Sequence, residues 1–162
     1  MKKQTKVVKR RRRENKTNYS KRLKLLKGRH IRFVVRKSNK YIVLQIIKSI
    51  RAQDNVLVSV STKDLLKYGW PSEKTGSLKS LGASYLGGLL LGKKVQGKIK
   101  GRVILDSGLI PNTKGSRVYA AVKGLKDSGI DINISEEVVP LMEKIEKKDF
   151  FNNVKSKIEG IK

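Results

Sequence analysis

Residues 31–47 constrain the fold most, because apolar and polar side chains alternate there on both sides of a short polar stretch, Lys37-Ser38-Asn39-Lys40. Alternation with a period of two is typical of strands that bury one face. Both arms are rich in β-branched and aromatic residues, so they predict a β-hairpin with the polar stretch at its tip. Arg32 and Arg36 are expected to point away from the core, which gives an apolar platform with a cationic edge. The residues expected on the buried face are Ile31, Phe33, Val35, Ile42, Leu44 and Ile46.

The charge of the chain indicates a polyanionic partner. It has 39 Lys and Arg against 13 Asp and Glu, a formal net charge of +26 over 162 residues. Self-repulsion on this scale destabilises a compact state unless counter-charge is bound, and nucleic acid supplies that charge with release of condensed counterions. A membrane surface is the other candidate polyanion. No apolar run reaches roughly 18 residues, which excludes a spanning helix. The absence of Cys excludes disulfides, thiolate zinc sites and Cys nucleophiles.

The segment Met1–Arg29 holds fourteen Lys and Arg against one acid, Glu14, and so carries half of the net charge. It includes the run Lys9-Arg10-Arg11-Arg12-Arg13 and has few apolar residues at its start, so we expect an extended arm that contacts a polyanion. The alternative is a solvated tail or a nuclear-localisation run. Residues 19–27 predict a short helix in this arm, with three apolar side chains sharing one face: Tyr19, Leu23 and Leu26.

Two further strands are predicted. Residues 55–61 alternate and follow a turn expected at 53–55, so they predict a third antiparallel strand that completes a meander. Residues 102–106 are a short, almost continuous apolar run, which is typical of a buried strand that lies parallel to its neighbour.

Helices are expected over residues 77–91 and 115–126. The first contains several glycines, which weaken an isolated helix but suit close packing against a sheet, and Gly92 is expected to help end it. The predicted fold class is therefore α/β, with a mixed sheet of a three-stranded antiparallel meander plus one parallel strand, and with helices packed on it.

Three parts are expected along the chain: a basic arm over 1–29, an α/β domain over 30–130 and a C-terminal helical tail over 131–162. Seven of the thirteen acids lie in the tail, so we expect it to pack on the domain or dock a protein rather than face phosphate. An apolar helical stripe is predicted there from Phe150, Phe151, Val154 and Ile158.

No group of residues predicts a catalytic site. His30 is the only His, so no His-pair metal motif is present, and neither a metal nor a cofactor is expected. One alternative is a metal-dependent RNA-processing enzyme that uses Asp106 with Asp64, because such an enzyme needs converging carboxylates. The structural interpretation is a buried hydrogen bond for Asp106 and a turn or cap role for Asp54 and Asp64. A nonspecific cationic nucleic-acid binder is a second alternative, although it leaves the well-patterned core unexplained.

The segment Thr113-Lys114-Gly115-Ser116-Arg117 places two cations, a glycine and hydroxyl groups at the start of a predicted helix. Free backbone N–H groups and the positive end of the helix dipole favour phosphate at such a start. The alternative is an ordinary cap, with Thr113 or Ser116 as the N-cap residue and the cations exposed. We favour the phosphate interpretation, because cations are unfavourable at a helix start unless an anion binds there.

Three aromatic residues, Tyr19, Tyr41 and Trp70, are candidates for stacking on an unpaired base. Packing is the expected role for Tyr19, and a lid over the core is the expected role for Trp70. The sequence does not choose among the three for stacking.

Several ordered segments resemble one family, the archaeal–eukaryotic branch of large-subunit ribosomal protein eighteen, which is the 5S-rRNA-binding protein numbered five in eukaryotic large subunits. The resemblance runs from about Arg10 to Pro140. The tail after Pro140 departs from the family, whose members in this branch often run longer. The segments that carry the resemblance are Arg10–Glu14, Lys16–Tyr19, Arg22–Lys27, Val35–Lys40, Tyr68–Trp70, Ala83–Leu90, Leu105–Leu109 and Pro111–Ala120.

The resemblance implies a non-enzymatic constituent of the large subunit that binds 5S rRNA and anchors it in the central protuberance with 23S-type rRNA. The implied partners are these rRNAs and neighbouring large-subunit ribosomal proteins in the cytoplasmic ribosome, with no membrane and no small-molecule substrate. Cations of the arm, the hairpin tip and the segment before the second helix are expected to contact RNA. The predicted RNA-binding residues are Arg10, Arg11, Arg12, Arg13, Lys16, Tyr19, Arg22, Arg32, Arg36, Lys37, Ser38, Asn39, Lys40, Thr113, Lys114, Gly115, Ser116 and Arg117.

Overall fold

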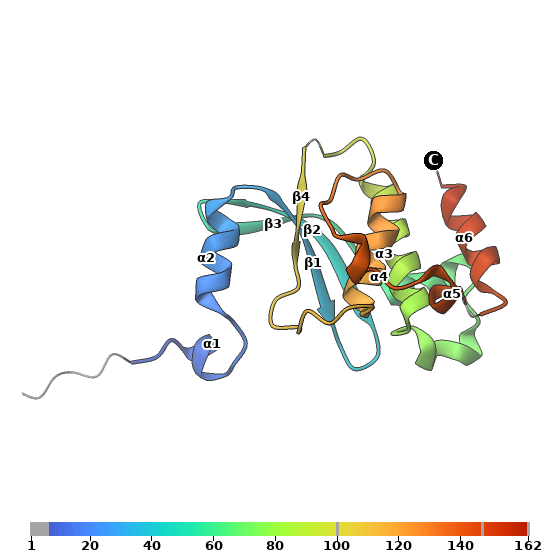
Figure 1. Ribbon diagram of the computed structural model, residues 1–162, viewed down its shortest axis with the longest axis horizontal. Helices are drawn as coiled ribbons and strands as arrows, with labels where there is room; N and C mark the ends of the chain where they lie inside the picture. Colours follow the sequence, from blue (N-terminus) through green and yellow to red (C-terminus); the bar gives the residue numbers. More distant parts are fainter. Residues whose placement is uncertain (1–6, 100, 147, 162) are drawn as a thin grey trace, which may run out of the picture.

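A computed structural model describes residues 7–99, 101–146 and 148–161 of the chain. Four strands form one sheet in the order β3-β2-β1-β4 (Figure 1). The first three strands are antiparallel neighbours, and β4 is parallel to β1. The predicted fold class is therefore confirmed. The strands are β1 (Ile31–Lys37), β2 (Ile42–Ile50), β3 (Gln53–Ser61) and β4 (Val103–Asp106).

The predicted buried face of the hairpin is confirmed, except that Ile31 is only half-buried. Phe33 lies opposite Ile46, and Val35 lies opposite Leu44. All four side chains are fully buried or nearly so, and Ile42 is buried with them. Because side chains alternate along a strand, the odd-numbered residues of β1 face the core and the even-numbered ones face the other side of the sheet.

The turn between β2 and β3 lies at Arg51 and Ala52, so the turn predicted at residues 53–55 is misplaced. Both residues have positive φ, 49° and 66°. Two central residues of this conformation match the twist of a two-residue hairpin, although Asn and Gly are the usual residues there. Without that turn signal, the sequence did not mark the position.

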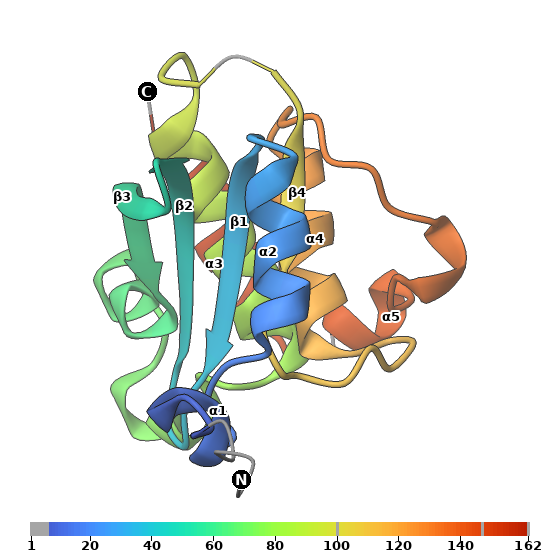
Figure 2. The same cartoon turned by 90° about the vertical axis from the view of Figure 1, so that its left-hand side faces the viewer.

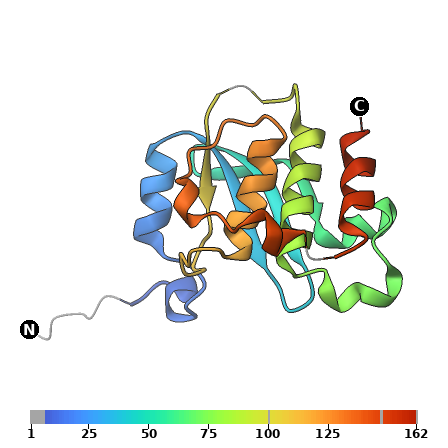
Figure 3. The same cartoon turned by 45° about the vertical axis from the view of Figure 1, so that its right-hand side comes forward.

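Two helices, α3 (Leu81–Val95) and α4 (Arg117–Asp127), pack against one face of the sheet and against each other (Figures 1 and 3). Glycines allow this close approach. A Cβ atom added at Gly88 would overlap the Ala121 carbonyl, and one at Gly124 would overlap the Tyr85 carbonyl. The glycines of the predicted helix therefore allow close packing, as the sequence predicts. Helix α3 packs closely against α4 as well as against the sheet.

The predicted bounds of α3 are shifted towards the C-terminus. The helix begins after Ser80, whose side chain accepts a hydrogen bond from the Ala83 N–H. It continues through Gly92, the residue expected to help end it. Gly92 lies so close to Ser128 that a Cβ atom would overlap that side chain. This glycine is a packing residue and not a stop. The helix predicted from 115 begins two residues later, at Arg117.

The described part of the arm is largely helical rather than extended. It forms one turn, α1 (Arg10–Arg13), and the predicted helix α2 (Tyr19–Lys27). Figure 2 shows α2 in front of β1 and β4 and running alongside them, on the side of the sheet away from α3 and α4. Its predicted apolar face is wrong at Leu23, which is 55% exposed, whereas Leu25 and Leu26 are half-buried. Tyr19 is only half-buried and does not join the core.

The C-terminal part packs on α3 (Figure 3). Phe151, Val154 and Ile158 are buried in the main core, which confirms the predicted stripe. Trp70 is 2% exposed with its ring centroid 4.8 Å from that of Phe150, so it is a lid over the core and is not available to stack on a base. The remaining elements are η1 (Thr62–Tyr68), η2 (Ser72–Ser77), η3 (Glu136–Val138), α5 (Met142–Ile145) and α6 (Phe151–Glu159).

Candidate nucleic-acid interface

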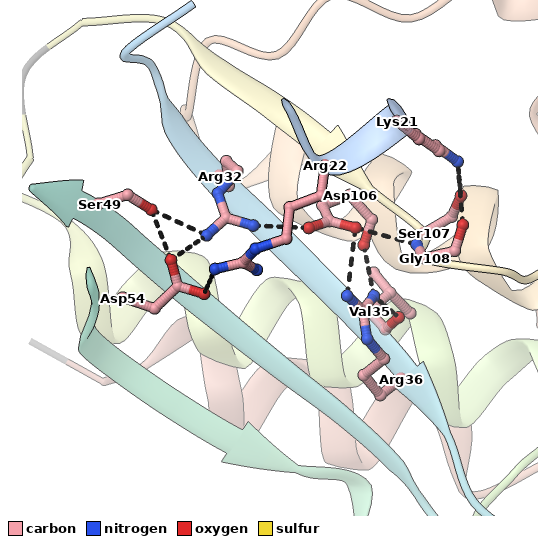
Figure 4. A network of polar contacts seen from close by, with 10 residues as sticks. All are labelled: Lys21, Arg22, Arg32, Val35, Arg36, Ser49, Asp54, Asp106, Ser107 and Gly108. Atoms are coloured by element: carbon pink, nitrogen blue, oxygen red, sulfur yellow. Dashed lines mark hydrogen bonds and ion pairs between the residues drawn. The ribbon is translucent and has the colours of Figure 1, made fainter. Parts of the chain in front are cut away.

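Arg32, predicted to lie on an exposed cationic edge, is a buried residue at the centre of an ion-pair network (Figure 4). One guanidinium nitrogen lies 2.7 Å from Asp106 Oδ2, and the other lies 2.6 Å from Asp54 Oδ1 and 2.8 Å from Ser49 Oγ. Only 1% of Arg32 is exposed, so it does not reach a phosphate on the surface. A buried guanidinium needs carboxylate partners, and the fold supplies them from β3 and β4.

Asp106 at the end of β4 accepts hydrogen bonds from three directions. Besides Arg32, its oxygens accept from Arg36 Nη2 at 3.1 Å and from the Gly108 N–H at 2.9 Å. Arg36 also donates to the Asp106 main-chain carbonyl at 2.8 Å. Burial alone would raise the pKa of Asp106, but the Arg36 charge, the Gly108 N–H and Arg32 outweigh it and lower that pKa. The hydrogen-bonded role predicted for Asp106 is confirmed.

The same network attaches α2 to the sheet. Arg22 Nη2 donates to Asp54 Oδ2 at 3.0 Å. Lys21 Nζ donates to Ser107 Oγ at 3.2 Å and to the Gly108 carbonyl at 3.1 Å. Burial would raise the pKa of Asp54, but hydrogen bonds from Ser49, Arg22 and Arg32 outweigh it and lower that pKa. Two acids thus hold three cations in fixed places: Arg22 of α2 and Arg32 and Arg36 of β1.

A cleft of about 410 Å³ lies between the arm, the end of β1 and the segment that follows β4. A second cavity of about 500 Å³ lies between the hairpin and the segment before α4, and Lys37 and Ile110 line both cavities. The three predicted RNA-binding regions therefore adjoin one another. The cations that line the first cleft are Arg11, Lys16, Lys21, Arg22, Arg36 and Lys37.

The hairpin tip is exposed and its turn is held by Ser38. The Ser38 hydroxyl accepts from the Tyr41 N–H at 2.9 Å and donates to the Tyr41 carbonyl at 2.8 Å. The Asn39 carbonyl accepts from Lys79 Nζ at 3.1 Å. Lys37 and Lys40 project from this ordered turn and form no ion pair among the residues that the structure describes.

In the one-turn helix α1 the predicted arginines are exposed. Arg10 Nε lies 3.8 Å from Glu14, which also pairs with Lys16 at 2.9 Å. Arg11 donates to Thr17 Oγ1 at 2.9 Å, which aims its side chain along the cleft edge. Arg12 and Arg13 lie in the same turn and are exposed as well.

At the segment before α4, Ser116 is the N-cap residue, and its side chain makes no capping hydrogen bond. Gly115 has a φ of 69°, a conformation that favours glycine, and Thr113 and Arg117 are exposed beside it. Lys114 Nζ lies 3.7 Å from Glu137 on an exposed surface, which is a weak, solvent-screened pair. The segment therefore presents cations at a helix start, as predicted.

Comparison with known proteins decides the family. The family described as "Ribosomal large subunit proteins 60S L5, and 50S L18" matches residues 3–101, more than half of the chain. Large ribosomal subunit protein uL18 of Korarchaeum cryptofilum (strain OPF8) is 47% identical over 135 residues, covering 83% of this chain and 67% of that protein. The corresponding protein of Methanothrix thermoacetophila is 47% identical over 131 residues, covering 81% and 75%. That of Methanococcoides burtonii is 42% identical over 140 residues, covering 86% and 79%.

The chain belongs to this ribosomal protein family. Its family makes it a structural constituent of the large ribosomal subunit, located in the cytoplasmic ribosome, and not an enzyme. The resemblance drawn from the sequence is thereby confirmed. Among the described residues, no helix is both long and apolar enough to cross a membrane.

The geometry agrees with the family in giving no support to the enzyme alternative. Asp64 forms a capping box with Ser61 at the start of η1, and Asp106 is engaged by Arg32 and Arg36. Within the described ranges, no three His, Cys, Asp or Glu side chains come together as a metal site. The two carboxylates proposed for metal chemistry are thus occupied with structural partners.

Sequence reasoning missed Lys21, Asp54 and the segment Ser107–Ile110 as parts of this interface. Lys21 is one lysine among many in the arm, and the sequence around Asp54 predicts a turn or cap role. Only the resemblance marked residues 107–109, without assigning them a role. No local pattern signals these residues, because the contacts that join the arm to the domain link residues 32 to 87 positions apart along the chain.

Proposed function

We propose that this protein binds 5S rRNA and helps to anchor it in the central protuberance beside 23S-type rRNA, next to other large-subunit proteins. The observation that carries the proposal is the junction of the arm, the hairpin and the segment before α4 around two cavities that share Lys37. Membership of the family supports an rRNA partner, and the net charge of +26 supports a polyanion.

In this proposal the exposed cations contact phosphates and the sheet fixes their spacing. Arginine is suited to the task because its planar guanidinium donates two parallel hydrogen bonds to one phosphate. The deep major groove of A-form RNA admits few side chains, so recognition rests on shape and backbone contacts. The proposed contacts are the predicted residues other than Arg32, which instead orders the network beneath them.

Three parts of the chain have separate roles in this proposal. Residues 1–29 act as the RNA-binding arm, residues 30–130 as the 5S-rRNA-binding domain and residues 131–162 as a tail. The apolar side chains of the tail lie in the core shared with α3, so its structural role is to cover that helix. Two half-buried tyrosines, Tyr19 and Tyr41, stay available for stacking on an unpaired base.

Competition binding tests the proposal. The protein is titrated into labelled 5S rRNA at two salt concentrations, with an unrelated structured RNA of equal length as competitor. We expect 5S rRNA to be preferred at both concentrations, because counterion release alone is blind to sequence and weakens with salt. Equal competition that collapses at the higher salt would identify a nonspecific cationic binder and overturn the proposal.

A further inference from the structure

Asp54 is an acid placed within the cationic interface. Its two oxygens accept from three side chains on two sides: Oδ1 from Arg32 at 2.6 Å and from Ser49 at 2.7 Å, and Oδ2 from Arg22 at 3.0 Å. Arg32 and Ser49 belong to the sheet, whereas Arg22 belongs to α2, so one carboxylate joins the arm to the domain (Figure 4).

We infer that Asp54 is a positioning residue for RNA binding: its carboxylate docks α2 on the sheet and so holds the arm cations along the cleft. The inference rests on the proposed RNA-binding function. The charge of an acid repels RNA. By this inference, Asp54 nevertheless favours the specific complex, because it holds the arm cations in place.

The arm needs such an attachment. Helix α2 has nine residues, and isolated helices shorter than about 12–15 residues are marginal in water. None of its residues is fully buried, so apolar packing contributes little to holding it in place. Its cation Arg22 lies on the same carboxylate as Arg32, and without that carboxylate the two guanidinium groups would repel each other.

The other attachment of α2 is weaker. Lys21 donates only to uncharged oxygens of Ser107 and Gly108, at 3.2 and 3.1 Å. Only one partner is charged in these hydrogen bonds, whereas both are charged in the Arg22–Asp54 pair, which therefore adds a Coulomb attraction that the Lys21 contacts lack. Asp54 is therefore the acid that pairs with α2 among the described residues, and its loss is expected to undock the helix.

Replacing Asp54 with Asn separates positioning from net charge. Simple electrostatics predicts tighter binding to every RNA, because the variant gains one unit of positive charge. Positioning predicts instead that Asp54→Asn binds 5S rRNA about tenfold more weakly than wild type. Binding to heparin, a shapeless polyanion, is expected to stay equal or become slightly tighter. The matched control is Asp131→Asn, the same chemical change at an exposed acid outside the network, with no loss for 5S rRNA.

Hydrogen exchange of the free protein gives a readout that does not depend on RNA. We expect amides of α2 to exchange faster in Asp54→Asn while those of β1 and β2 keep their protection, and we expect Asp54→Glu to restore part of both exchange protection and affinity. Unchanged protection of α2 together with equal or tighter 5S rRNA binding would overturn the inference.

A second variant keeps the test decisive if Asp54→Asn fails to fold. Arg22→Lys leaves the charge and the buried Arg32 contacts intact but removes the guanidinium that donates to Asp54. It is expected to speed exchange in α2 and to weaken 5S rRNA binding about threefold. Because Arg22 is itself a proposed RNA contact, the exchange of α2 in the free protein decides the test, and unchanged exchange would overturn the inference. If wild type itself shows no preference for 5S rRNA, the proposed function fails, whereas the exchange data still decide whether Asp54 docks the arm.

Discussion

The two faces of the sheet are stabilised by different interactions. Towards α3 and α4 the sheet presents Phe33, Val35 and Leu44, and the helices approach closely through glycines. Towards α2 it presents Arg32, which pairs with carboxylates from two other strands. Apolar burial is favourable whatever the orientation of the side chains, whereas a buried ion pair gains little net free energy and requires one geometry.

This contrast teaches how a protein with a large positive charge can hold its cations in place. The apolar face supplies the stability of the domain. The charged face fixes directions, since each guanidinium is bound by oxygens at set positions (Figure 4). An RNA backbone presents phosphates at fixed spacings, so an ordered array of cations suits it better than a flexible one.

The largest expected effect tests the charged face. Arg32→Met should destabilise the protein by about 3–5 kcal/mol, because it removes the buried partner of two carboxylates. Urea unfolding measures the change. Arg36→Met is the matched control: its side chain is 47% exposed, so we expect a loss of at most about 1 kcal/mol. Equal losses for the two variants would show that burial does not distinguish these arginines.

The next effect tests the apolar face. Gly88→Ala should cost about 3 kcal/mol, since the new methyl group overlaps the Ala121 carbonyl and the two helices must separate. Alanine has the higher helix propensity, so a propensity effect would have the opposite sign. Gly76→Ala has no atom within 4 Å of the new Cβ and should change stability by less than about 0.5 kcal/mol. Thermal or urea unfolding of both variants decides between packing and propensity.

A binding measurement compares cations of the hairpin tip, which are proposed RNA contacts, with cations of the C-terminal tail. Lys37→Ala with Lys40→Ala should weaken 5S rRNA binding about tenfold, or ~1.4 kcal/mol, and reduce the salt dependence by about 0.7–0.9 per lost phosphate contact. Lys144→Ala with Lys157→Ala removes the same charge from exposed positions of the tail. That control should keep both affinity and salt slope. Equal weakening by the two pairs would indicate nonspecific attraction.

The smallest effect is the pH dependence of the charged face. The folded-state pKa values of Asp54 and Asp106 lie below the ordinary value of 3.8. Their ionised forms therefore contribute stability that is fully present above pH about 5 and is lost as pH falls below 3.8 through the lowered values. The free energy of unfolding, measured from pH 6 to pH 2, should therefore decrease as the pH falls. Asp54→Asn should make this decrease smaller, and an unchanged decrease would contradict the assignment.

Much of the fold follows from the sequence because its pattern is local. Alternation in β1 and β2, the apolar run of β4 and the stripe of α6 each identify an element and its buried face. The element ends were less predictable. Gly92 looks like a helix stop until Ser128 is known to pack against it, and Arg51 with Ala52 carries no glycine to mark a turn.

The sequence by itself determined the α/β class, the family and the regions that carry the cations. Only the tertiary structure decided which cations are available, because exposure depends on partners that are distant in sequence. Arg32 and Arg36 lie on the same face of one strand, yet the first is buried and the second is half-exposed. The difference arises because Asp54, 22 residues after Arg32, and Asp106, 74 residues after it, meet over Arg32 when β3 and β4 join the sheet.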